Sequence, residues 1–179
     1  MDAVEEVLHQ WKTVRPDLDV EPMGIVGRLS RVSGIFASEI ADTFGRHGLS
    51  ASSFDVLATL RRSGEPYTLS AGELTSRMMI SSGSTTNRIQ RLEAVGLVQR
   101  TADKSDARRT MVRLTKTGHD IIDRAVRDHV GTQATLVAGL DREDREHLER
   151  ILRKLEAGRT EGASKGSCDR RSQSAFPPD

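Results

Sequence analysis

The sequence predicts a mainly α-helical protein with one small β-hairpin. Apolar residues recur at helical spacing through most of the chain, and glycine or proline separates the resulting segments. One charged loop lies between two short β-prone runs. At 179 residues, with 36% hydrophobic residues, the chain has the size and composition of one folded domain with a few additional helices.

Two helices are predicted before residue 49. The first spans residues 2–14 and is stopped by Pro16, and the second spans residues 22–46 and ends at Gly48. Their apolar stripes are Val4, Val7, Leu8, Trp11 and Val14 in the first, and Ile25, Leu29, Val32, Phe36, Ile40 and Phe44 in the second. Because a small domain cannot cover stripes of this length, a helical interface with a second copy is expected.

The centre of the chain reads as helix, tight turn, helix and hairpin. Ser50 caps a helix that runs to residue 62, and Phe54, Leu57 and Leu60 face its core. A short helix over 70–78 precedes a turn at 81–83 and a further helix that Gly96 closes. Residues 98–101 and 110–115 are β-prone and flank a charged loop, 102–109, which predicts a wing.

Two more helices follow the hairpin. The first begins at Thr115 or Thr117, carries a broad apolar face that includes Val137, and is interrupted at Gly139. The second runs from residue 141 to about 157. The aliphatic residues cease there, so the remainder is expected to be disordered. The predicted division is 1–48 for the N-terminal helices, 49–116 for a winged helix-turn-helix domain, 117–157 for C-terminal dimerisation helices and 158–179 for the tail.

Composition removes several classes of protein. A single cysteine, Cys168, is incompatible with multi-cysteine zinc sites, and 3% aromatic residues is too few for binding single strands by base stacking. No run approaches the roughly 20 apolar residues of a membrane helix. Asp2, Glu5 and Glu6 stand where a signal peptide would be basic, so a cytoplasmic protein is expected. The five histidines are scattered, with no paired spacing typical of a metal site, and neither a metal nor a cofactor is expected.

Charge is distributed unevenly along the chain. Residues 68–115 contain eight basic and four acidic side chains, a net charge of +4, whereas the whole chain has +1. A basic segment inside an otherwise mildly acidic protein indicates a surface that meets a polyanion such as double-stranded DNA.

The helix after the tight turn has an unusual beginning. Residues 81–87 are poor or mediocre helix formers, but small hydroxyl and amide side chains leave the free N–H groups of a helix start accessible to phosphate and base edges. With Ile89 and Leu92 facing inward, Arg91 points outward and can reach a guanine. The alternative is a serine-rich loop before an ordinary surface helix. The candidate DNA contacts here are Ser82, Ser84, Thr85, Thr86, Asn87 and Arg91.

The charged loop supplies a second candidate contact with DNA. Arg108 and Arg109 can enter a minor groove or pair with phosphates, and Asp106 can orient one guanidinium through both carboxylate oxygens. A solvated polar hairpin is the alternative for the loop taken alone, but its position directly after a recognition helix favours the wing.

These motifs resemble the MarR family of transcriptional regulators over nearly all of residues 2–157. The resemblance is carried by Leu49-Ser50 with Phe54 and Leu57, by the run from Asn87 to Val98, and by Asp106-Ala107-Arg108 ahead of Leu114-Thr115-Lys116-Thr117-Gly118. It implies a homodimeric winged helix-turn-helix DNA-binding protein, dimerised through its terminal helices. A repressor that binds a pseudo-palindromic operator is expected.

A narrower similarity, to the urate-responsive branch of the family, involves Trp11, Asp55, Arg62 and Arg88. It implies a site for a small anionic ligand, with urate favoured and citrate or aconitate as alternatives. Two arginines suit an anion, Trp11 can cover a planar ring, and Asp55 can accept from ring N–H groups. The structural alternative is an ordinary ion pair of Asp55 with Arg62 and a Trp11 that packs on its apolar stripe.

Other functional classes have less support. A winged-helix module that binds protein partners without sensing a ligand is the main alternative, because this fold also makes protein contacts. The net charge of the central segment argues against it. No phosphate-binding loop, nucleophile elbow or two-histidine zinc motif is present in the sequence, so an enzyme is not expected.

Overall fold

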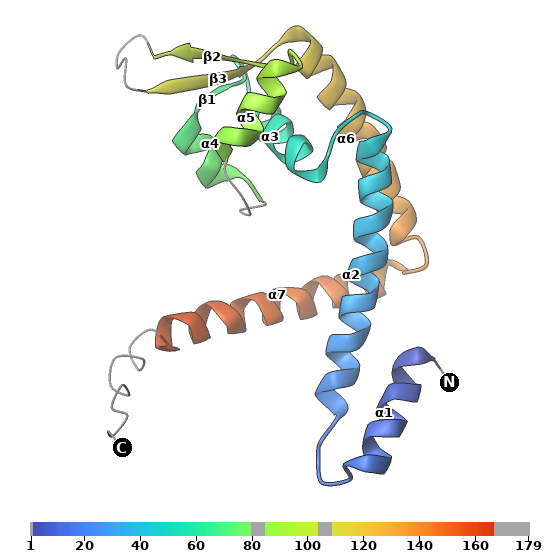
Figure 1. The fold of residues 1–179 in the computed structure, drawn as a ribbon. Helices are drawn as coiled ribbons and strands as arrows, with labels where there is room; N and C mark the ends of the chain where they lie inside the picture. The colour runs from blue at the N-terminus through green and yellow to red at the C-terminus, as the bar shows by residue number, and fades with distance from the viewer. Residues whose placement is uncertain (1, 80–84, 104–108, 167–179) are drawn as a thin grey trace, which may run out of the picture. The chain divides into compact units, whose positions relative to one another are not determined.

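The computed structural model describes residues 2–79, 85–103 and 109–166, with side chains through residue 158. Its internal contacts divide the chain into two units, Met1–Ala134 and Thr135–Asp179. The first unit consists mainly of helices with one three-stranded antiparallel sheet (Figure 1), which confirms the predicted fold class.

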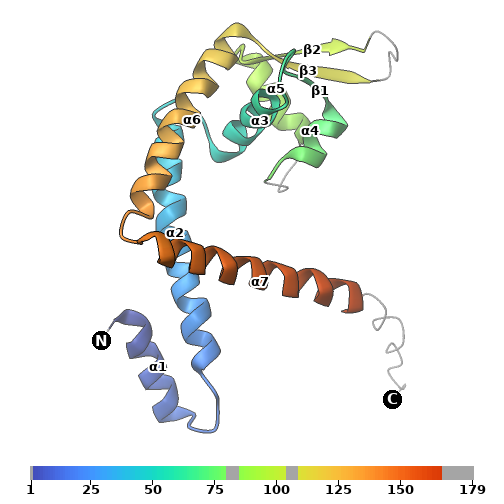
Figure 2. The same ribbon diagram turned by 180° about the vertical axis from the view of Figure 1, so that it is seen from behind.

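Helices α1 (Ala3–Val14) and α2 (Glu21–Gly45) form an antiparallel hairpin at the start of the first unit. A capping box between Asp2 and Glu5 begins α1, and Pro22 lies in the first turn of α2. A Cβ atom built on Gly24 would lie 2.9 Å from Leu8 Cδ1, so this glycine allows the two helices to pack closely. Both views show α1 beside the N-terminal part of α2 (Figures 1 and 2).

The N-terminal half of the apolar stripe of α2 is exposed within one chain. Ile25, Leu29 and Val32 keep 59%, 46% and 45% of their surface accessible, whereas Phe44 near the end of the helix is buried. Only the C-terminal end of α2 therefore joins the hydrophobic core.

The core lies among α3 (Ala51–Arg62), α4 (Ala71–Arg77), α5 (Thr85–Ala94), the sheet and α6 (Lys116–Leu136). Ser50 caps α3 by accepting from the N–H of Ser53. Gly48 and Gly96 have φ values of 68° and 72°, the left-handed conformation that ends α2 and α5 as predicted. The fully buried core side chains include Val56, Leu57, Leu60, Leu74, Val112 and Ile122.

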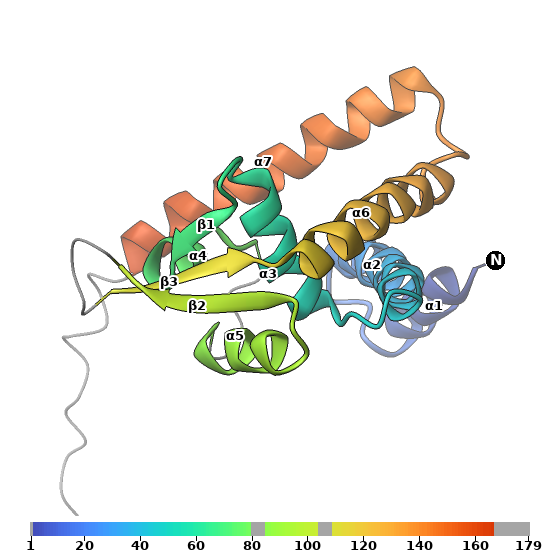
Figure 3. The same cartoon turned by 90° about the horizontal axis from the view of Figure 1, so that it is seen from above.

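The sheet has the strand order β1-β3-β2 (Figure 3). β2 (Val98–Ala102) and β3 (Thr110–Leu114) form the predicted hairpin. β1 (Thr68–Ser70) pairs antiparallel with β3 and was not predicted. It has three residues, too few for alternating hydrophobicity to be recognised, and its last residue is also the N-cap of α4.

Helix α6 (Lys116–Leu136) connects the sheet to α2. The hydroxyls of Thr43 and Thr132 lie 2.7 Å apart, and His47 Nε2 lies 2.8 Å from Asp128 Oδ2. The helix ends at Leu136, so the prediction that it continues past Val137 to Gly139 was wrong. Two turn hydrogen bonds, from Ala138 to Thr135 and from Leu140 to Val137, replace the helical pattern there.

The second unit contains α7 (Arg142–Gly166). Its backbone continues nine residues past 157, so the start of the predicted disordered tail at residue 158 was wrong. Gly158 costs a helix only about 1 kcal/mol, and the alanine, glutamate, arginine and lysine residues around it favour helix. Cys168 and the rest of the predicted tail lie outside the described residues. The described helices include none that combines the length and apolarity needed to cross a membrane.

Candidate nucleic-acid interface

Helix α5 presents the predicted polar face. Ile89 and Leu92 are buried at 3% exposure and fix the inward side of the helix. Thr86, Asn87 and Arg91 are exposed, and Thr85 is half-buried at the helix start. Ser82 and Ser84, the other two candidates from this run, lie outside the described residues. The described part of α5 thus offers hydroxyl, amide and guanidinium groups to solvent from one helix.

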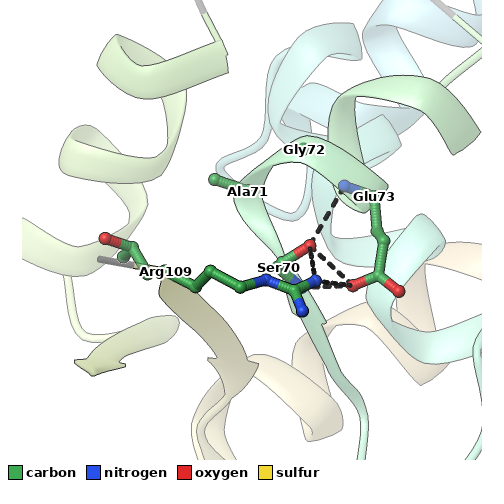
Figure 4. Close-up of a pocket in the computed structure, with 6 residues that line it drawn as sticks. Ser70, Ala71, Gly72, Glu73 and Arg109 are labelled. Atoms are coloured by element: carbon green, nitrogen blue, oxygen red, sulfur yellow. Dashed lines mark hydrogen bonds and ion pairs between the residues drawn. The ribbon is translucent and has the colours of Figure 1, made fainter. Parts of the chain in front are cut away.

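The base of the wing carries one described candidate, Arg109, and Asp106 and Arg108 lie outside the described residues. The N–H of Asp103 donates to the carbonyl of Arg109 at 3.0 Å, which joins the two ends of the hairpin loop. Arg109 is exposed, but its guanidinium points back to the start of α4 (Figure 4). Its Nη2 lies 3.9 Å from Glu73 Oε2 and 3.5 Å from Ser70 Oγ.

Sequence reasoning missed Ser70 and Glu73 as neighbours of the wing. They form the capping box of α4: the Ser70 hydroxyl and N–H donate to Glu73 Oε2 at 2.6 and 2.9 Å, and the Glu73 N–H donates to Ser70 Oγ. The Ser70 hydroxyl and N–H, followed by the Arg109 charge, hold the pKa of Glu73 below its ordinary value. The Ser-x-x-Glu spacing was a readable signal for the cap, but no sequence pattern links it to Arg109.

A second carboxylate, Glu93, fastens α5 to β2. It accepts from the Arg100 N–H at 3.0 Å and from Arg100 Nε at 2.7 Å, and the guanidinium lowers its pKa. Arg100 belongs to the basic segment, but its charge is paired with Glu93 of the same domain.

Three of the four predicted ligand residues lie on two helices in contact. Asp55 and Arg62 are on α3, and Arg88 is on α5, which packs against α3. Asp55 is only 5% exposed and accepts from the N–H of Met79 at 3.3 Å. The Arg62 guanidinium donates to the carbonyl of Arg77. Asp55 and Arg62 therefore both hold the segment that leads from α4 toward α5.

Trp11 does not join these three residues within one chain. It lies on α1, which packs along the N-terminal part of α2, while α3, α4 and α5 follow the other end of that helix (Figure 1). From Gly24 to Gly45 a helix rises roughly 30 Å, at about 1.5 Å per residue. Trp11 is 40% exposed in the single chain.

A separate polar cluster lies where α3 meets α6. Arg61 Nε donates to Asp123 Oδ1 at 2.6 Å, and its guanidinium carbon stands 5.0 Å from the centre of the Tyr67 ring. His119 is tilted against the same ring at 5.0 Å. Among the described residues, no group of three or more histidine, cysteine, aspartate or glutamate side chains is placed to hold a metal ion.

The sequence of this chain is similar to those of known transcriptional regulators. The MarR family model matches residues 47–109. The transcriptional regulator PecS of Dickeya dadantii is 38% identical over 153 residues, covering 86% of this chain and 92% of its own.

Solved structures share the fold. Sco3205 of Streptomyces coelicolor, a MarR family regulator in complex with DNA, has a TM-score of 0.69 at 22% identity over 79% of this chain and 89% of its own. Bordetella bronchiseptica BpsR, whose DNA binding is regulated by 6-hydroxynicotinic acid, has a TM-score of 0.65 at 24% identity over 78% of this chain and 96% of its own. The chain belongs to the MarR family and is a DNA-binding transcriptional regulator with a winged helix-turn-helix domain.

Proposed function

We propose that this protein is a homodimeric repressor that binds a pseudo-palindromic operator and is released by a small anionic ligand. The exposed polar start of α5, held in place by buried Ile89 and Leu92, is the observation that carries the DNA-binding surface. In the proposed complex, two recognition helices enter successive major grooves and the wings reach the flanking minor grooves.

The wing contact is tested by substitution of its arginines. Arg108→Ala and Arg109→Ala are expected to weaken binding to all duplexes. The two arginines are proposed to contact phosphates or the negatively charged minor groove, and not a particular base. Each lost phosphate contact also reduces the slope of log affinity against log salt by about 1. Fluorescence anisotropy of a labelled duplex at several salt concentrations measures both quantities.

Arg100→Ala is the matched control, because Arg100 is already paired with Glu93. It removes the same charge from the same domain and leaves the salt slope near that of the wild type. A slope unchanged in the wing variants would remove Arg108 and Arg109 from the interface.

The proposed ligand acts through the segment between α4 and α5. Asp55 and Arg62 hold the N–H of Met79 and the carbonyl of Arg77, so a ligand that engages these two side chains competes with both hydrogen bonds. Arg88 extends the same site onto the recognition helix. Release of the segment shifts α5 from the position that DNA requires, and a coupling of about 1–3 kcal/mol lowers DNA affinity about 5- to 150-fold.

Trp11 enters this proposal through dimerisation. Within one chain, Trp11 and α3 lie at opposite ends of α2. A site that combines Trp11 with Asp55 would therefore take its tryptophan from the partner subunit. The exposed apolar surface of α1 and α2 provides the interface on which the second subunit packs.

Intrinsic fluorescence tests the ligand site, because Trp11 is the only tryptophan. We expect saturable quenching by urate, after correction for ligand absorbance against free tryptophan. Quenching by citrate or aconitate alone retains the site and changes its ligand. No response to any of the three returns Trp11, Asp55 and Arg62 to a structural role.

Arg62→Ala provides the second readout. The variant loses the ligand response, because Arg62 is proposed to contact the ligand. It keeps DNA affinity close to that of the wild type, because Asp55 still holds the Met79 N–H of the α4–α5 segment and Arg62 does not contact phosphate. Arg61→Ala, which disrupts the neighbouring pair with Asp123, retains the response. Loss of DNA affinity together with the ligand response would make Arg62 a structural support of the α4–α5 segment.

A further inference from the structure

The start of α4 and the base of the wing line an open pocket. It is separate from the recognition helix and from the proposed ligand site. Its volume is about 520 Å³. Figure 4 shows the side chains around it. The residues that line it are Ser70, Ala71, Gly72, Glu73, Arg109 and Thr110. The pocket therefore lies between the first helix of the helix-turn-helix and the wing. Its lining contains one cation, Arg109, and one anion, Glu73.

The anion of this pocket is rigidly held and the cation is not. Two hydrogen bonds of 2.6 and 2.9 Å hold the Glu73 carboxylate on Ser70, which is itself buried, and the Glu73 N–H donates back to Ser70 Oγ at 3.3 Å. Arg109 reaches these two residues only at 3.9 and 3.5 Å, and its side chain is about half exposed. The guanidinium can therefore leave the pocket while the carboxylate stays.

We propose that Glu73 restrains the wing by occupying Arg109 in the DNA-free protein, and that a DNA phosphate takes the place of this carboxylate when the duplex binds. The proposal rests on the proposed role of Arg109 at DNA. A guanidinium donates to carboxylate and phosphate oxygens in the same geometry, so the two anions compete for the same N–H groups. Glu73 then sets how much of the wing's charge is available to DNA.

The negative charge of Glu73 is separable from its capping role. Glutamate and glutamine both complete a capping box at the third helical position, because each presents an oxygen to the N-cap N–H. Hydrogen bonds from Ser70 keep the pKa of Glu73 low, so its side chain is a carboxylate at neutral pH. Glu73→Gln therefore removes the charge and retains an acceptor at the start of α4.

A double-mutant cycle on the full-length protein tests the restraint. Glu73→Gln, Arg109→Gln, the double variant and Glu65→Gln are titrated against a labelled mixed-sequence duplex at low and high salt. Glu65 is an exposed carboxylate of the same domain, so its substitution reports the general effect of losing one negative charge. Thermal denaturation verifies that each variant is folded.

The expected result is that Glu73→Gln binds duplex about two- to fivefold more tightly than Glu65→Gln, the range for an exposed ion pair, and that the gain shrinks at high salt. In the Arg109→Gln background, Glu73→Gln gives no gain beyond the control. An equal gain in both backgrounds, or weaker binding by Glu73→Gln, would overturn the restraint.

Failure of the underlying function has a different signature. If Arg109→Gln binds with wild-type affinity and salt slope, Arg109 does not contact DNA and the restraint falls with that assignment. If Arg109→Gln weakens binding but Glu73→Gln changes nothing, the role of Arg109 stands and the restraint alone is wrong.

Discussion

At the scale of single residues, Gly118 lies where close packing leaves no room for a side chain. A Cβ atom at this position would lie 2.0 Å from the carbonyl oxygen of Leu97. The same turn is held by Thr115, whose N–H donates to that carbonyl and whose hydroxyl donates to Gly96 and accepts from the Gly118 N–H. Gly118 thus lets the start of α6 approach the turn that follows α5.

We expect Gly118→Ala to lower the free energy of unfolding by about 1–3 kcal/mol, because backbone atoms must shift to admit the methyl group. Urea denaturation followed by circular dichroism measures the change. Gly131→Ala is the matched control on the same helix, where a Cβ meets nothing within 4 Å. It is expected to stabilise by about 0.5–1 kcal/mol. Equal effects of the two substitutions would contradict the packing argument.

At the scale of elements, Arg61 and Asp123 join α3 to α6. The guanidinium lowers the pKa of Asp123, and about 40% of each side chain remains exposed, so water screens the pair. The pKa of Asp123 is lower in the folded protein than in the unfolded chain. The pair therefore contributes its full stabilisation at pH values well above 3.8. That stabilisation is lost as the pH falls below this value.

Asp123→Asn is therefore expected to cost up to about 1 kcal/mol at pH 7 and progressively less as the pH falls below about 4. Urea midpoints at a series of pH values give this comparison. Asp120→Asn is the control, because the Asp120 carboxylate lies on the same helix with only a 3.9 Å contact to His119. A difference between wild type and Asp123→Asn that persists unchanged into acid would disprove the ionic contribution.

At the scale of the whole molecule, one chain leaves much of the apolar face of α2 uncovered. Leu29 and Val32 are about half exposed, and burial of such side chains stabilises by about 1.5–3 kcal/mol each when complete. We expect the Leu29→Glu, Val32→Glu double variant to be monomeric in sedimentation equilibrium and to bind operator-length DNA weakly. Arg31→Glu, at an exposed polar position of the same helix, should stay dimeric. A dimeric double variant would place the interface elsewhere.

The helices and the hairpin could be predicted because each has a local cause. The glycines at 48 and 96 and the cap at Ser50 are readable signals, and the inward Ile89 and Leu92 follow from helical spacing. β1 could not be predicted, because a three-residue strand is stabilised by its partner β3 and not by its own pattern. The end of α7 was misplaced because loss of aliphatic residues predicts loss of burial and not loss of helix.

The sequence by itself determined the order of the helices and the hairpin, the basic segment and the polar start of α5, because propensity, spacing and charge are properties of neighbouring residues. Only the tertiary structure shows that Asp55 and Arg62 both hydrogen-bond to the segment between α4 and α5, and that Arg109 lies beside Glu73. It also places Trp11 at the end of α2 that is distant from α3. These contacts join residues that no helical or strand period relates, so only the packing of one element against another brings them together.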